Sequence, residues 1–109
     1  MTVEEILQKI EGKVQEYPEV IEGLNATYMF HITGEDGGEY SVTFSDKKAE
    51  INKGETDKAD CKVTINVDNF KKMIQGNLNA TTAFMTGKIK VKGNMGLALK
   101  LESILKKLA

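Results

Sequence analysis

The sequence predicts a two-layer α+β domain in which a five-stranded sheet carries helices on one face only. Apolar residues recur at helical spacing at both ends of the chain, and five short segments alternate apolar and polar residues as half-buried strands do. Because each strand offers one apolar face, a single layer of helices suffices to cover the sheet. The chain of 109 residues has the length of one domain, 1–109.

The first element is a helix that begins after Thr2. Thr2 and Glu5 have the spacing of a capping box, and apolar residues then recur every three or four positions, at Val3, Ile6, Leu7, Ile10 and Val14. Pro18 ends this helix, and "PEVIEGL" predicts a short second helix that stops at Gly23.

A period of two begins at Asn25 and predicts the strands of the first half. Residues 34–38 form a turn, so the two strands around it make a hairpin, and further strands follow near residue 50 and over residues 61–66. The residues expected to face the helices are Tyr28, Phe30, Ile32, Tyr40, Val42, Phe44, Ala49, Ile51, Cys61, Val63 and Ile65. Met29 and His31 fall on the opposite, polar face.

The last third of the chain returns to helical spacing. The apolar positions Val67, Phe70, Met73 and Ile74 predict a helix that ends at Gly76, and "NATTAFMTG" predicts a brief one. A fifth strand alternates Ile89 and Val91 with three lysines, and Asn94 can cap a last helix that runs to about Leu108.

Charge is segregated along the chain. Residues 1–60 hold 6 Lys and 14 acidic residues, a balance of −8, whereas residues 61–109 hold 9 Lys and 2 acidic residues, a balance of +7. Every basic residue is Lys, so the planar guanidinium fork that reads phosphates and guanine is missing, and aromatic residues are few. This composition disfavours a nucleic-acid partner.

Few residues are available for catalysis or metal binding. His31 is the only histidine and falls on the polar strand face, while Cys61 is the only cysteine and falls on the inward face, where a thiol is normally inert. We therefore expect no enzyme, no cofactor and no metal site. "KGNMG" before the last helix is a weak candidate for a phosphate cradle, because a strand-to-helix joint needs glycine for backbone reasons alone.

Three lysines on the fifth strand have two interpretations. Lysines on an edge strand discourage strand-to-strand aggregation. They can also attract the protein to an anionic lipid surface or partner. The residues concerned are Lys88, Lys90 and Lys92.

Apolar residues outside the main stripe are the informative feature of the last helix. Leu97, Leu101, Ile104, Leu105 and Leu108 form one stripe that faces the sheet, whereas Met95 and Leu99 lie on nearly the opposite side. Such residues pack against another element, line a ligand cavity or stay exposed. The pattern leaves open whether they, with Phe70, Met73, Phe84 and Met85, fill the core or line an apolar pocket.

The C-terminal half resembles the sterol carrier protein type 2 family of nonspecific lipid-transfer domains, as a stand-alone domain of prokaryotic type. The resemblance is carried by "ADCKVTI" and by "DNFKKMIQGNLNATTAFMTGKIKVKGNMGLALKL". It implies a mostly antiparallel sheet with an apolar lipid tunnel between sheet and helices, which binds fatty acids, acyl-CoA, phospholipids or sterols without covalent chemistry. The expected lipid-contact residues are Phe70, Met73, Ile74, Phe84, Met85, Met95, Leu97 and Leu99.

Location and partners follow as expectations. The N-terminal "MTVEEILQKIEG" is acidic where a signal peptide is basic, and the end "KKLA" differs from the peroxisomal tripeptide of eukaryotic members, so we expect a cytoplasmic protein. The expected partners are a lipid or acyl-chain ligand and transient contact with an anionic membrane, with the chain as a monomer or weak homodimer. The alternative is an interaction module of the same fold, in which Met95 and Leu99 meet a partner chain and no lipid is bound.

Overall fold

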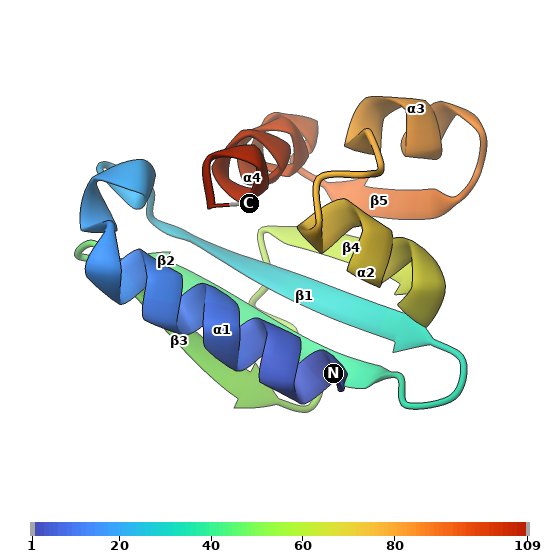
Figure 1. Cartoon of the computed structure of the whole chain (residues 1–109), viewed down its shortest axis with the longest axis horizontal. Helices are drawn as coiled ribbons and strands as arrows, with labels where there is room; N and C mark the ends of the chain where they lie inside the picture. The colour runs from blue at the N-terminus through green and yellow to red at the C-terminus, as the bar shows by residue number, and fades with distance from the viewer. Residues whose placement is uncertain (1, 109) are drawn as a thin grey trace.

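A computed structural model describes residues 2–108; Met1 and Ala109, the last residue of "KKLA", lie outside the described residues. The elements follow in an order that confirms the predicted α+β class (Figure 1). They are α1 (Val3–Glu16), η1 (Pro18–Ile21), β1 (Ala26–Thr33), β2 (Gly38–Ser45), β3 (Lys48–Lys53), β4 (Cys61–Asn66), α2 (Val67–Ile74), α3 (Ala80–Met85), β5 (Ile89–Gly93) and α4 (Met95–Leu108).

The five strands form one sheet in the order β3-β2-β1-β4-β5. Three of the four pairings are antiparallel, and the β1–β4 pairing is parallel. The sheet is therefore mostly antiparallel, as expected, and β3 and β5 are its edge strands.

The β2–β3 hairpin has a two-residue turn at Asp46 and Lys47. Both residues have positive φ angles, 50° and 62°. Such a turn matches the right-handed twist of the flanking strands, and this accounts for two non-glycine residues in an uncommon backbone conformation.

Helices cover one face of the sheet (Figure 1). Helix α1 contacts β3 at one side, while α2 and α4 contact β4 and α3 contacts β5 at the other. The capping box of α1 forms as predicted, with the Glu5 N–H donating to Thr2 Oγ1 at 3.2 Å and the Thr2 N–H to Glu5 Oε1 at 3.1 Å. The predicted second helix is a four-residue 3₁₀ helix, η1, which is the tighter form common in short connectors.

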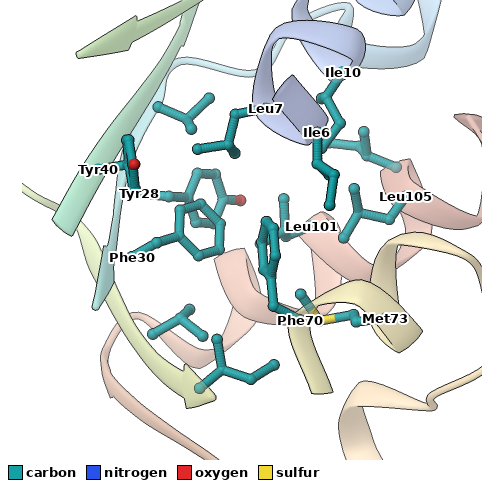
Figure 2. Packing of buried hydrophobic residues seen from close by; sticks show 14 of the residues in the cluster. Ile6, Leu7, Ile10, Tyr28, Phe30, Tyr40, Phe70, Met73, Leu101 and Leu105 are labelled. Carbon is teal, nitrogen blue, oxygen red and sulfur yellow. The ribbon is translucent and has the colours of Figure 1, made fainter. Parts of the chain in front are cut away.

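The core lies between the two layers. Phe70 of α2 is fully buried and its ring lies 6.1 Å from that of Phe30, edge to face; Tyr28 and Phe44 make a similar pair at 5.7 Å. Figure 2 shows Tyr28 and Phe30 of β1 and Phe70 of α2 in the same cluster as Leu7 of α1 and Leu101 of α4.

The open face of the sheet departs from simple alternation at two paired residues, Met29 and Ser41, which are both buried. Met29 points away from the helices, as the strand pattern predicts, but is only 1% exposed. It lies on the central strand, where its register partners Ser41 and Lys62 flank it on both sides. Shielding by neighbours on two strands explains burial without a covering layer.

Side-chain hydrogen bonds hold α4 near both of its ends. The hydroxyl of Tyr28 donates to the Leu97 carbonyl at 2.6 Å, and Lys13 Nζ donates to the Leu108 carbonyl at 2.6 Å. Asn94 caps the helix as predicted, because its side chain accepts from the Leu97 N–H at 3.2 Å. Burial raises the pKa of Tyr28, so its hydroxyl keeps the proton that it donates.

No helix within residues 2–108 is both long enough and apolar enough to cross a membrane.

Replacing Phe70 with alanine tests the packing of the core. We expect Phe70→Ala to lower the free energy of unfolding by about 3–5 kcal/mol, because the ring is fully buried between the layers. Chemical denaturation measures this change. The matched variant Phe84→Ala removes a partly exposed ring, and a loss as large there would contradict the assigned packing.

Removing the Tyr28 hydroxyl tests the attachment of α4. We expect Tyr28→Phe to lower the free energy of unfolding by about 1 kcal/mol and to speed hydrogen exchange in the first turns of α4. Tyr40→Phe is the control, since the Tyr40 ring is also buried but its hydroxyl makes no hydrogen bond within residues 2–108. Equal exchange in the two variants would show that the bond to Leu97 does not hold the helix.

Candidate functional site

Helix α4 borders three voids that follow one another through the protein. The first, which we call the α1–α2–α4 cavity, has a volume of about 360 Å³ and lies among these helices. Figure 2 shows Ile6 and Ile10 of α1 beside Leu105 of α4 in this region. Its lining is Ile6, Lys9, Ile10, Lys13, Lys71, Ile74, Gln75, Leu105 and Leu108.

The second void, the core void, lies between the helices and the sheet and measures only about 20 Å³. Phe70 and Leu101 are among the side chains that fill the space around it. It shares Ile10, Ile74 and Leu105 with the α1–α2–α4 cavity, so the two spaces lie on either side of these residues.

The third void, the α3–α4 pocket, measures about 60 Å³ and shares Leu101 with the core void. It lies where α3 and α4 meet β4 and β5, and its lining is almost entirely apolar. The lining residues are Val63, Met73, Thr81, Phe84, Ile89, Val91, Met95, Ala98, Leu99, Leu101 and Glu102.

The structure brings four of the eight predicted lipid-contact residues together in the α3–α4 pocket: Met73, Phe84, Met95 and Leu99. Phe70 lines the core void, and Ile74 lines both this void and the α1–α2–α4 cavity. Met85 and Leu97 lie outside the three linings. Met85 is 79% exposed, and the carbonyl of Leu97 accepts the Tyr28 hydrogen bond.

The residues off the main stripe of α4 are partly exposed at the opening of the α3–α4 pocket. Leu99 is 54% exposed, and Met95 and Phe84 are exposed to a similar degree. Large apolar side chains of this kind mark a surface that meets a ligand, a membrane or another protein. The geometry therefore agrees with a pocket opening.

The lysines of β5 lie apart from this apolar opening. Ile89 and Val91 face the pocket, so the alternation of the strand directs Lys90 and Lys92 to the open face of the sheet, where Lys92 is the register partner of Lys62. Lys88 is also exposed, just before the strand. Because β5 is an edge strand, protection of the edge accounts for these lysines, and docking on an anionic surface stays a prediction.

The candidate catalytic residues do not form a site. His31 Nδ1 lies 2.8 Å from Glu39 Oε1 on the open face, and Cys61 is buried beneath the helices. Burial raises the pKa of the Cys61 thiol, and the negative charge of Asp60 raises it further, so the unreactive thiol form is favoured. Neither residue lines a void, and within residues 2–108 no three His, Cys, Asp or Glu side chains gather as metal ligands.

Backbone geometry accounts for Gly93 in "KGNMG". Its φ angle is 97°, and a Cβ atom there would lie 2.5 Å from the Asp60 carbonyl oxygen. The Asn94 N–H donates to that same oxygen at 3.1 Å. This close approach of two backbone segments requires glycine without any bound phosphate.

The α1–α2–α4 cavity is not predicted by the sequence pattern. Ile6 and Ile10 belong to the core-facing stripe of α1, and Lys9 and Lys13 repeat the same spacing three positions further along. That pairing of an apolar stripe with adjacent lysines is a signal, but its meaning depends on how α1, α2 and α4 approach one another.

The comparisons with known proteins agree with this architecture. The model of the SCP-2 sterol transfer family matches residues 3–106. Hydroxysteroid dehydrogenase-like protein 2 of Homo sapiens is 38% identical over 104 residues, which are 94% of this chain and 24% of that protein, so the chain spans about a quarter of its relative.

The comparison with solved structures also finds proteins of the same fold. A sterol carrier protein domain of Helicoverpa armigera matches with a TM-score of 0.79 and 28% identity over 97% of this chain and 86% of that one. The fold is also that of palmitated SCP2L2 from Aedes aegypti, with a TM-score of 0.74, 23% identity and coverage of 96% and 95%. The chain thus belongs to the SCP-2 sterol transfer family.

Proposed function

We propose that the protein binds the acyl chain of a lipid between its helices and its sheet and transfers it without covalent chemistry. The observation that carries this proposal is the succession of three voids along α4, linked by the apolar side chains that they share. Each methylene that leaves water in such a site contributes about 0.8 kcal/mol.

Two of the three voids are smaller than a bound lipid requires. Pockets for small molecules usually measure about 300–1,000 Å³, whereas the core void and the α3–α4 pocket measure about 20 and 60 Å³. Binding therefore needs side chains around Phe70 and Leu101 to move apart. Helices α2 and α4 both line all three voids, so a displacement of either helix would widen them.

A flexible acyl chain suits this arrangement better than a rigid sterol. A chain can follow a narrow path between side chains and needs little width at any point, whereas fused rings need one wide space already formed. The palmitated state of the Aedes aegypti protein supports the same ligand class. Fatty acids, acyl-CoA esters and phospholipids are all included in the proposal.

An interaction module is the second candidate. The exposed side chains of Phe84, Met95 and Leu99 support it, because they form an apolar surface that a partner chain can cover. This candidate requires a stable oligomer without bound lipid. Contact with an anionic membrane through Lys88, Lys90 and Lys92 belongs instead to the lipid-transfer proposal, as a route by which the ligand is delivered.

Native mass spectrometry of gently purified protein tests the proposed function directly. We expect a population of protein whose mass is raised by one lipid, and organic extraction should identify an acyl chain. Light scattering at high protein concentration tests the interaction module, because it shows whether the protein forms a stable dimer. A stable dimer of bare mass that fails to bind a fluorescent fatty acid would replace lipid transfer with the interaction module.

A charge at the opening of the α3–α4 pocket should impair binding. We expect Leu99→Asp to weaken the binding of a fluorescent fatty acid roughly 5–10-fold, because a carboxylate there places an unpaired charge beside the chain. Ser103→Asp is the matched control, since Ser103 is exposed on the same helix and lies outside all three linings. Equal affinity in the two variants, with the fold intact, would remove Leu99 from the site.

A further inference from the structure

The polar part of the α1–α2–α4 cavity consists of three lysines and a glutamine. Lys9 and Lys13 stand one turn apart on α1, Lys71 faces them from α2, and Gln75 follows at the end of α2. The remaining lining is apolar, and no acidic residue belongs to it. The cavity thus combines a cationic side with an apolar interior.

Within residues 2–108, the lysines of this cavity form no ion pair. The four ion pairs within residues 2–108 involve other lysines or His31, and none includes Lys9, Lys13 or Lys71. Like charges spaced one turn apart on a helix repel each other. An anion placed among the three ammonium groups would relieve this repulsion and accept charge-assisted hydrogen bonds.

One of the lysines already has a structural role. Lys13 donates to the Leu108 carbonyl at 2.6 Å and so satisfies a backbone group at the end of α4. Its side chain makes no other hydrogen bond within residues 2–108. Lys9 and Lys71 make no side-chain hydrogen bond within residues 2–108, which makes them the better positions for a test.

The apolar interior of the cavity continues toward the core. Ile10, Ile74 and Leu105 separate it from the core void, which α4 in turn separates from the α3–α4 pocket. An amphiphile whose charged group lies at the lysines therefore has an apolar route for its chain. Burial of the acyl chain and pairing of the headgroup charge with the lysines both favour this orientation over one with the headgroup at the α3–α4 pocket.

We propose that the α1–α2–α4 cavity receives the anionic headgroup of the bound lipid, a carboxylate or a phosphate, and makes the protein selective for anionic over neutral amphiphiles. This inference rests on the proposed lipid-binding function and adds an orientation and a ligand class. Lys9, Lys13 and Lys71 supply the charge, and Ile6, Ile10, Ile74, Leu105 and Leu108 contact the first part of the chain.

Isothermal titration with three ligands of equal chain length tests the proposal: dodecanoate, dodecyl phosphate and 1-dodecanol. We expect the wild-type protein to bind the two anions at least about tenfold more tightly than the alcohol. The double variant Lys9→Gln/Lys71→Gln should lose roughly tenfold in affinity for both anions and retain its affinity for the alcohol. A preference between the two anions assigns the headgroup to a carboxylate or a phosphate.

The control variant is Lys48→Gln/Lys53→Gln, which changes the net charge equally but lies on edge strand β3. It should bind all three ligands as the wild-type protein does. As a measurement independent of substitution, raising sodium chloride from about 20 mM to about 0.5 M should weaken dodecanoate binding and spare 1-dodecanol, because salt screens charge.

The possible outcomes distinguish the headgroup site from the lipid-binding function on which it rests. Equal affinities for the three ligands, unchanged in Lys9→Gln/Lys71→Gln, would overturn the headgroup site while the lipid-binding function stands. An equal loss in the control variant would overturn it too, because the effect would then come from net charge. Failure of the wild-type protein to bind any of the three would overturn the proposed function together with this inference.

Discussion

The parallel pairing of β1 with β4 is the constraint on which the rest of the molecule depends. It joins an N-terminal unit, made of α1 and the strands β1 to β3, to a C-terminal unit that begins at β4. Without this pairing α1 and α4, far apart in the sequence, would not lie on the same face of one sheet. The α1–α2–α4 cavity and the core void lie between side chains of both units, whereas residues of the C-terminal unit alone line the α3–α4 pocket.

Helix α4 has a buried apolar stripe and also carries exposed apolar residues. Its apolar stripe covers the sheet with Leu101, Ile104 and Leu105, while Leu99 and Met95 remain at the surface. Hydrogen bonds from Tyr28 and Lys13 hold its two ends to different parts of the molecule. In the proposed lipid-binding function, loss of one of these hydrogen bonds would let that end of α4 move while the other end stays attached. Local stability of this kind varies within a protein, and binding elements are drawn from its less stable parts.

Much of the fold could be predicted because local patterns decide it. Strand alternation identified the inward residues of β1, β2 and β4, and the capping pairs at Thr2 and Asn94 located two helix starts. Burial of Met29 could not be read from alternation, since it depends on neighbours supplied by two other strands. Four candidate site residues meet in one pocket, but only Met95 and Leu99 lie off the stripe of α4; Met73 belongs to the apolar stripe of α2, and Phe84 lies on α3. The lysine-lined cavity was not predicted, because it arises only from the packing of three helices.

The sulfur-containing side chains are buried to very different extents, and this affects how the protein would respond to oxidants. Cys61, Met29 and Met73 are enclosed, whereas Met85 is largely exposed and Met95 borders the α3–α4 pocket. Oxidation converts methionine to a polar sulfoxide. Peroxides would therefore reach Met85 and Met95 first and leave the sheet intact. The earliest damage to this protein would be a wetter pocket opening in an otherwise folded chain.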